Sequence, residues 1–375
     1  MPSGRLVPWL LLLPSACGLP APTTFPLASP RLSVLGLSAA RGIFDPSLIA
    51  TGNAAFPFAL ALSAVEATSN ISTALAVYDA ALGSFVRVSA VNTAQGPASF
   101  PCVGGAPCTA TLIHEVPSLV ADPADPSPAR AIKVFSHSYL VLPSGELHYE
   151  LGFISLHTAP TVSGPWASTP LLGWASSSPL STAGVAQVLT DLPELRDCLA
   201  FSEPGALLTA RGLLLALTCI SAPSGSPARI RVVLLLSSNH GSSWAYSGLA
   251  LDGSDAPFLG NFTVPQLSAP DLFTSATGET YLVVTPAAPL WDSFVGYAGC
   301  FVVRLNAEHT GVVRDAAGAP VVEQIILPDG LAFNGACTAA VGAGNASAVG
   351  DAYVSVLLQD GLFTIVPTRI AAAGG

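Results

Sequence analysis

The phrase Asp45-Pro46-Ser47-Leu48-Ile49 decides the fold, because related phrases recur along the chain. In each phrase a proline opens an apolar run, which is followed by a turn and a second apolar run. The recurrences are Val116-Pro117-Ser118-Leu119-Val120, Glu203-Pro204-Gly205-Ala206-Leu207 and Ala269-Pro270-Asp271-Leu272-Phe273, with a looser copy at Asn334-Gly335-Ala336-Cys337. The successive spacings are 71, 87, 66 and 65 residues. Repeats of this length are typical of folds built from similar units, because one unit cannot bury its own apolar faces.

Each unit consists of strand-like segments. Residues 232–236, 281–284 and 301–303 are short, apolar and bounded by turn-forming residues, which is typical of strands. No segment shows a sustained helical periodicity of apolar residues. Residues 54–68 are rich in alanine, but Pro57 and the strand-like continuation favour a strand. The sequence therefore predicts an all-β chain with little helix.

The composition excludes two classes of partner. The chain has 375 residues, and 13 lysines and arginines against 23 acidic residues give a formal charge of −10. Lys133 is the one lysine and the arginines are scattered, so we expect no cationic patch for nucleic acid or anionic lipid. Hydrophobic residues make up 51% of the chain, which is enough for a large core.

The first residues have the pattern of a secretory signal. Arg5 precedes an apolar run over residues 6–13, and small residues follow up to Gly18, where we expect cleavage. The run is too short to span a bilayer, which takes about 20 residues. An alternative is a lipoprotein signal, in which Cys17 carries the lipid anchor. Either pattern predicts a secreted protein, extracellular or periplasmic.

Export predicts disulfide bonds, because the compartment is oxidising. Six cysteines remain without Cys17, and six cysteines allow 15 connectivities. Our predicted pairs are Cys102–Cys108, Cys198–Cys219 and Cys300–Cys337. No Cys-x-x-Cys occurs and the histidines have no recognisable zinc spacing, so we expect neither a metal nor another cofactor.

Two phrases mark tight turns between outer strands. The stretch from Ser237 to Trp244 contains Asn239 and Gly241 in the spacing of the Asp-box, with asparagine in place of aspartate. The second phrase is Gly164-Pro165-Trp166. In both, glycine suits a tight turn and tryptophan can pack beneath it.

These phrases resemble five-bladed β-propeller glycoside hydrolases of the arabinanase/xylosidase and fructosidase families, over roughly residues 42–369. The Asp-box adds a secondary resemblance to sialidases. The resemblance implies a five-bladed β-propeller of four-stranded blades and a carbohydrate substrate. We expect a signal over residues 1–18, an N-terminal segment over 19–41, one propeller domain over 42–370 and a tail over 371–375. We also expect a monomer.

The resemblance implies roles for three carboxylates. In those families an aspartate of the first blade acts as base or nucleophile, a later glutamate is the general acid, and a third carboxylate lies in an Ala-Pro-Asp phrase. Asp45 fits the first role, Glu203 the second and Asp271 the third. The order of the last two blades is reversed here, so Glu115 and Asp122 compete with Asp271.

Blade geometry gives a separate reason to examine these residues. Inner strands of a propeller converge on one channel mouth, and carboxylates that meet there push their pKa values apart. Hydrolysis of a glycosidic bond needs one protonated and one ionised carboxyl. We therefore expect Asp45 and Glu203 to face each other across the mouth, with His137 as a candidate sugar contact.

Three functions remain open at this point. The first is a secreted glycoside hydrolase. The second is a propeller that binds carbohydrate or protein without catalysis. The third is a sialidase-like enzyme, although Arg41-Gly-Ile-Phe lacks the arginine phrase that sialidases use.

Overall fold

The computed structural model describes residues 19–21, 23–26, 31–67, 70–175, 178–221, 229–255, 266–287, 299–329, 333–339, 352–357 and 362–371. Within these ranges the elements are strands and three-residue 3-10 helices, so the predicted all-β class is confirmed. The predicted signal and Cys17 lie outside the described residues. In the described part of the chain, no helix has the length and apolar character needed to cross a membrane.

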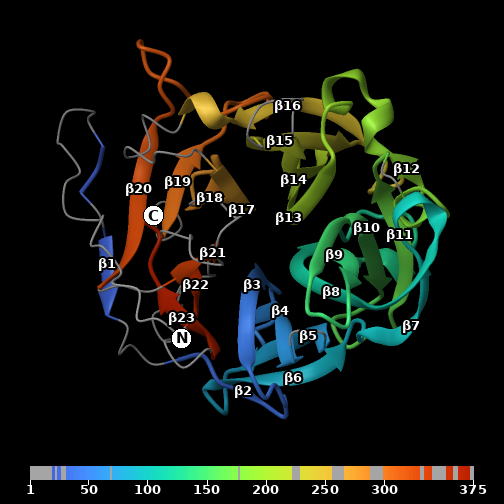
Figure 1. Cartoon of the computed structure of the whole chain (residues 1–375). Helices are drawn as coiled ribbons and strands as arrows, with labels where there is room; N and C mark the ends of the chain where they lie inside the picture. The colour runs from blue at the N-terminus through green and yellow to red at the C-terminus, as the bar shows by residue number, and fades with distance from the viewer. Residues whose placement is uncertain are drawn as a thin grey trace, which may run out of the picture.

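The strands form four hydrogen-bonded sheets around a central axis (Figure 1). One sheet contains β2 (Val34–Leu35), β6 (Ser84–Ala90), β5 (Asn70–Asp79), β4 (Phe58–Ala67), β3 (Gly42–Ala50), β23 (Phe363–Thr368), β22 (Ala352–Leu357) and β21 (Phe333–Ala339). The next contains β12 (Gln187–Val188), β11 (Ala167–Gly173), β10 (Leu147–Ala159), β9 (Ile132–Val141), β8 (Pro107–Ala121) and β7 (Gln95–Pro101). The third contains β13 (Ala200–Thr209), β14 (Gly212–Ser221), β15 (Arg229–Ser237) and β16 (Ala245–Leu251). The fourth contains β1 (Thr23–Pro26), β20 (Val322–Asp329), β19 (Cys300–Arg304), β18 (Thr280–Ala287) and β17 (Gln266–Thr274).

The sheet count differs from the predicted five sheets of four strands. The largest sheet holds two antiparallel groups, β3–β6 and β21–β23, which a parallel bridge between Gly42 and Phe363 joins into one. The first and last groups of strands therefore meet in a shared sheet. Among the described residues the β13–β16 sheet alone has four strands, because edge strands such as β1, β7 and β12 extend two of the others and the largest is a fusion of two groups.

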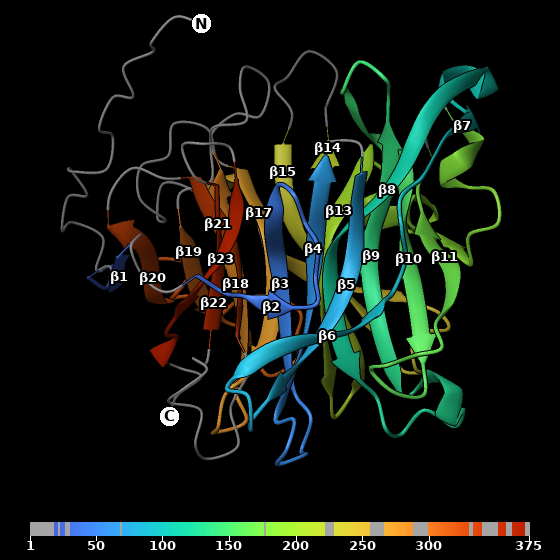
Figure 2. The same cartoon turned by 90° about the horizontal axis from the view of Figure 1, so that it is seen from below.

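The strands nearest the axis close a ring. β3 contacts β8, which contacts β13; β13 contacts β17, β17 contacts β21, and β21 contacts β3. These strands lie nearest the centre in Figure 1 and run along the axis in Figure 2. An apolar core lies between each neighbouring pair of groups. Residues 213–217 of β14 are continuously apolar because the alternate side chains enter the cores on its two faces.

Each inner strand carries a β-bulge at the repeated phrase. In β3, Asp45 and Pro46 lie between the pairs Phe44–Ser63 and Ser47–Ala61, so two residues face the single residue Leu62 of β4. Proline suits this position because it has no N–H for the ladder. The first bulge residue has a positive φ in every inner strand: Asp45 49°, Val116 51°, Glu203 54°, Ala269 46° and Ala336 50°.

Hydroxyl groups two residues after this position connect neighbouring inner strands. Ser47 Oγ accepts a hydrogen bond from Leu119 N–H at 2.9 Å, and Ser118 Oγ accepts one from Ala206 N–H at 2.7 Å. Both serines are buried. The hydroxyls therefore satisfy backbone donors that the bulges leave outside the ladders.

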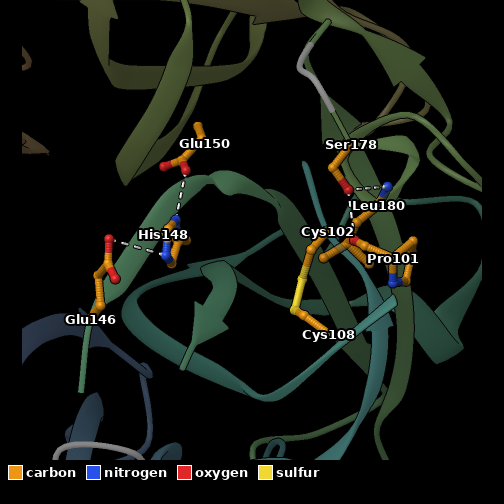
Figure 3. The surroundings of a disulfide bond; sticks show 8 residues. All are labelled: Pro101, Cys102, Cys108, Glu146, His148, Glu150, Ser178 and Leu180. Carbon is orange, nitrogen blue, oxygen red and sulfur yellow. Dashed lines mark hydrogen bonds and ion pairs between the residues drawn. A yellow bond between two sulfur atoms is a disulfide. The ribbon is translucent and has the colours of Figure 1, made fainter. Parts of the chain in front are cut away.

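All three predicted cysteine pairs are bonded. The Cα atoms are 5.8 Å apart for Cys102–Cys108, 5.6 Å for Cys198–Cys219 and 6.3 Å for Cys300–Cys337. The second pair ties the entry of β13 to β14, and the third joins β19 to β21. Figure 3 shows the first pair, which closes the turn before β8.

The Asn239 phrase forms the predicted turn between β15 and β16. Its Oδ1 accepts a hydrogen bond from Ser243 N–H at 2.9 Å. Asn306 Oδ1 accepts one from Thr310 N–H at 2.9 Å in the turn after β19. The two asparagines thus stabilise equivalent turns in two different groups of strands.

Replacing Ser118 by alanine should destabilise the fold. Ser118→Ala leaves the buried Ala206 N–H without its acceptor, which costs about 1–3 kcal/mol of the free energy of unfolding. Urea denaturation measures this cost. Ser242→Ala, in an exposed turn, is the matched control and should change stability by less than about 0.5 kcal/mol. Equal effects of the two substitutions would contradict this role of Ser118.

Candidate active site

A cavity of about 370 Å³ lies at one end of the axis. Asp45 of β3, Glu115 of β8 and Glu203 of β13 all line it. Asp45 and Glu203 are the positive-φ residues of their bulges, and Glu115 directly precedes such a residue. The repeated bulge therefore brings three of the predicted carboxylates to one place.

The five bulges narrow the central channel next to this cavity. They surround a void of only about 20 Å³, to which Asp45 and Asp271 both contribute. A second cavity of about 320 Å³ lies beyond it, lined by Asp271 and by residues that follow the bulges, such as Ser47 and Ala206. The axis thus holds two separate cavities, one on each side of the bulges.

Asp271 does not line the cavity of the other three carboxylates. The positive-φ residue of its strand is Ala269, so Asp271 occupies the place that Ser47 holds in β3. Burial raises the pKa of Asp271 to about 7, although hydrogen bonds with the Thr338 side chain and the Leu272 backbone oppose the rise. This aspartate belongs to the opposite side of the constriction.

Asp122 also lies away from this cavity, just after β8. Lys133 Nζ is 2.8 Å from both Asp122 Oδ2 and Asp125 Oδ2, and it donates to Arg130 O at 2.8 Å. His240 Nδ1 is 3.0 Å from Asp122 Oδ2. Asp122, Asp125 and His240 could converge on a metal ion, but the buried ammonium of Lys133 already supplies their positive charge. The cluster is therefore an ion-pair network of the fold.

Each cavity carboxylate has a defined hydrogen bond. Asp45 Oδ2 accepts one from Ser63 Oγ at 3.3 Å. Glu115 Oε1 accepts one from the Tyr139 hydroxyl at 2.7 Å. Glu203 Oε2 accepts two, from the Thr218 hydroxyl at 2.9 Å and from Ala269 N–H at 2.8 Å. These donors hold all three carboxyl groups in place around the cavity.

Burial and mutual repulsion raise two of the carboxyl pKa values. For Asp45, burial and the charges of Glu115 and Glu203 raise the pKa well above its ordinary value. Burial and the charge of Glu203 raise the pKa of Glu115 to about 7, against the lowering effect of the Tyr139 hydrogen bond. The cavity therefore favours the protonated forms of Asp45 and Glu115.

His137 lies directly opposite Glu115, on β9. Its side chain is fully buried and lines the cavity, and neither ring nitrogen has a hydrogen-bond partner among the described residues. Its ring stacks near those of Tyr139 and Tyr149, with centroid distances of 4.7 and 5.4 Å. Burial lowers the pKa of His137 to about 3, so the imidazole is neutral and has both a donor and an acceptor to offer.

His137 pairs with the residue that directly precedes the bulge of β8. In the other four groups of strands, the residue at the equivalent position carries a hydroxyl. These residues are Ser63, Thr218, Thr285 and Ser355. Three of them accept directly from the bulge N–H of the next inner strand, at 3.0 Å for Ser63, 2.9 Å for Thr285 and 2.8 Å for Ser355. Thr218 instead bonds Glu203, which accepts from Ala269 N–H. His137 is the exception to this structural pattern.

Tyr139 and Tyr149 were missed by the sequence analysis. A signal existed for Tyr139, because it lies two residues after His137 and therefore on the same face of β9. The two tyrosines also hydrogen-bond to each other, which extends the chain from Glu115.

The start of β10 carries Tyr149 and Leu147 into the cavity. His148, between them, points to the other face, where its Nδ1 is 2.7 Å from Glu150 Oε1 and its Nε2 is 3.4 Å from Glu146 Oε1 (Figure 3). These contacts hold the segment that presents the two cavity residues.

Arg41 is the one arginine among the described residues that line the cavity. The resemblance to sialidases implied an arginine phrase, which Arg41-Gly-Ile-Phe lacks. The described part of the cavity therefore lacks the feature that the sialidase interpretation requires.

The fold is similar to those of known glycoside hydrolases. A thermostable family-43 glycoside hydrolase matches with a TM-score of 0.51 and 11% identity, over 90% of this chain and 91% of that one. β-Fructofuranosidase from Schwanniomyces occidentalis matches with a TM-score of 0.53 and 8% identity. This match covers 90% of our chain and only 57% of the fructofuranosidase. The predicted resemblance is confirmed for the fold.

No protein-family model matches the chain, and no curated protein matches it. The structural similarity therefore establishes the fold alone. Any assignment of a reaction has to be argued from the residues that line the cavity.

Replacing Glu115 by glutamine should remove part of the pH dependence of stability. A carboxyl whose pKa rises from 4.5 to about 7 on folding stabilises the fold below its unfolded pKa, and this stability is lost as the pH rises through about 7. Glu115→Gln keeps an acceptor for Tyr139 but does not ionise. The free energy of unfolding of the variant relative to the natural protein should rise by about 2 kcal/mol between pH 5 and pH 8.

Urea denaturation at the two pH values measures this difference. Glu308→Gln, at an exposed turn, is the control and should show no such change. A Glu115→Gln difference that is the same at pH 5 and pH 8 would show that the cavity does not raise the pKa of Glu115.

Proposed function

We propose that this protein is a secreted glycoside hydrolase on a five-bladed β-propeller, in which β21–β23 and β3–β6 count as separate blades. The convergence of Asp45, Glu115 and Glu203 on one cavity, with raised pKa values for the first two, carries the proposal. Glycosidic bond hydrolysis requires a proton donor and an ionised carboxylate in close proximity. The fold is compatible with this reaction class, because known glycoside hydrolases have similar folds.

Glu115 is the general acid in this proposal. Its pKa of about 7 lets it hold a proton at neutral pH and release it to a leaving group. The sequence analysis gave this role to Glu203. The charge of Glu203 is, however, a cause of the raised pKa values of both Glu115 and Asp45, which favours Glu203 as the ionised base or nucleophile.

Asp45 and His137 complete the site. Asp45 is the third carboxylate, whose own proton keeps the total charge of the cavity low. His137, neutral and without a hydrogen-bond partner among the described residues, binds a hydroxyl group of the sugar. Neither role calls for a metal or cofactor.

The remaining expectations form part of the proposal. Three disulfide bonds suit an extracellular or periplasmic protein. A carbohydrate is the partner, and the protein works as a monomer. The predicted signal would be removed at about Gly18, unless Cys17 carries a lipid.

Substitution of the two glutamates should separate their roles. A first panel of α-L-arabinofuranosides, β-D-xylosides and β-D-fructofuranosides identifies the sugar. Glu115→Gln should then lower kcat by at least about 100-fold on alkyl glycosides, but by less than about 10-fold on dinitrophenyl glycosides, whose leaving group needs no proton. Glu203→Gln should lower kcat by at least about 100-fold on both, because it removes the base or nucleophile.

Asp271→Asn is the matched control, since it removes a buried carboxyl on the other side of the constriction. It should leave kcat within about twofold, on the general expectation for residues outside the reacting groups. Equal losses of Glu115→Gln on both leaving groups would contradict the acid role. Binding of sugars without hydrolysis of any would favour the non-catalytic propeller, and cleavage of sialosides would favour the sialidase-like enzyme.

A further inference from the structure

Among the described residues, five mainly apolar side chains line the mouth of the carboxylate cavity beside the exposed Arg41. Half-buried residues from four strands line it: Phe44 of β3, Leu147 and Tyr149 of β10, Ile220 of β14 and Phe363 of β23. We call these five residues the apolar rim. Phe44 and Phe363 stack with their ring centroids 4.8 Å apart, and the buried Val65 and Ile71 pack beneath them. Leu147 and Tyr149 pack against the same buried cluster, whereas Ile220 packs against a different one.

The rim lies farther from the constriction than the carboxylates do. Ile220 follows Thr218, the partner of Glu203, by two residues on the same face of β14. Two residues of a strand span about 7 Å. In β23, Phe363 pairs with Gly42, three residues before Asp45. A ligand that reaches the carboxylates consequently has its outer part beside the rim.

We infer that the substrate is a glycoside with an apolar aglycone, an alkyl or aryl group that packs on the rim while the sugar contacts the carboxylates and His137. This inference rests on the proposed function for the sugar half. The sugar would thus occupy the polar part of the cavity, and the aglycone would occupy the apolar rim.

A second sugar at the rim would fit poorly. Its hydroxyl groups would lose water against Phe44, Leu147, Ile220 and Phe363, whose side chains offer no hydrogen bond, and such unmade bonds are costly. The hydroxyl of the fifth rim residue, Tyr149, already bonds to Tyr139. An alkyl chain gains from the same surface, because each methylene that is fully buried strengthens binding by about fourfold. His137, by contrast, has both ring nitrogens available for a sugar hydroxyl.

Calorimetry with matched glycosides tests the inference. The probes are methyl and n-butyl α-L-arabinofuranoside, β-D-xyloside and β-D-fructofuranoside, and the protein is Glu203→Gln, which prevents turnover. For the sugar that binds, n-butyl should bind at least about tenfold more tightly than methyl, since three methylenes are added.

Two further substitutions in the same background separate the halves of the site. Ile220→Thr should reduce the butyl-to-methyl ratio at least about threefold, by loss of apolar contact, and leave methyl glycoside binding unchanged. Ile49→Thr, on the opposite cavity, is the matched control and should leave the ratio unchanged. His137→Ser introduces a hydroxyl residue, as in the other groups of strands. It should weaken the binding of methyl and butyl glycosides by the same factor.

Equal affinities for methyl and n-butyl glycosides would overturn the inference, even if the protein hydrolyses glycosides. A high butyl-to-methyl affinity ratio that falls in Ile220→Thr would support the inference. If the natural protein at the same time hydrolyses none of the glycosides, the proposed catalysis is overturned. Failure of every probe to bind would overturn the inference, and the turnover assay would then decide the proposed function by itself.

Discussion

The whole structure depends on a backbone conformation that L-residues avoid. Each inner strand holds a non-glycine residue at a φ between 46° and 54° in its bulge, at a cost of roughly 1–2 kcal/mol per residue. Such strain persists where surrounding contacts require it. Here the bulge N–H of Asp45, Val116 and Ala336 each donates to a hydroxyl of the neighbouring group. Closing the ring of strands and forming the bulges are thus one event.

The same constraint creates the chemistry of the cavity. Each carboxylate is the first residue of its bulge or, for Glu115, the residue before it, and all three line the cavity on one side of the constriction. Carboxyl groups in that position repel one another in a low dielectric. Asp45 and Glu115 respond with raised pKa values. A site able to donate a proton at neutral pH therefore follows from where the fold places its acids.

The sequence predicted much of this arrangement because the proline phrases mark the bulges. Asp45 and Glu203 precede their prolines, and both lie in the cavity, whereas Asp271 follows its proline and lies beyond the constriction. Alignment of the prolines would have placed Ala269, and not Asp271, beside Glu203. The fusion of two groups through Gly42 and Phe363 could not be predicted, because it depends on how the last strand meets the first.

The availability of His137 was equally hidden in the sequence. Its significance comes from the hydroxyl residues that occupy the same place in the other groups, and strand register alone identifies them. The apolar rim likewise combines residues as far apart as Phe44 and Phe363.

Direct titration of Glu115 tests the central claim, that Glu203 charges the cavity and Glu115 holds its proton. Carboxyl ¹³C NMR of glutamate-labelled protein, assigned by Glu115→Gln, follows this group from pH 4 to pH 9. The account predicts a pKa of about 7 in the natural protein, raised mainly by burial, and a lower value in Glu203→Gln, which lacks the charge. Titration of Glu115 near its ordinary value in both proteins would contradict it.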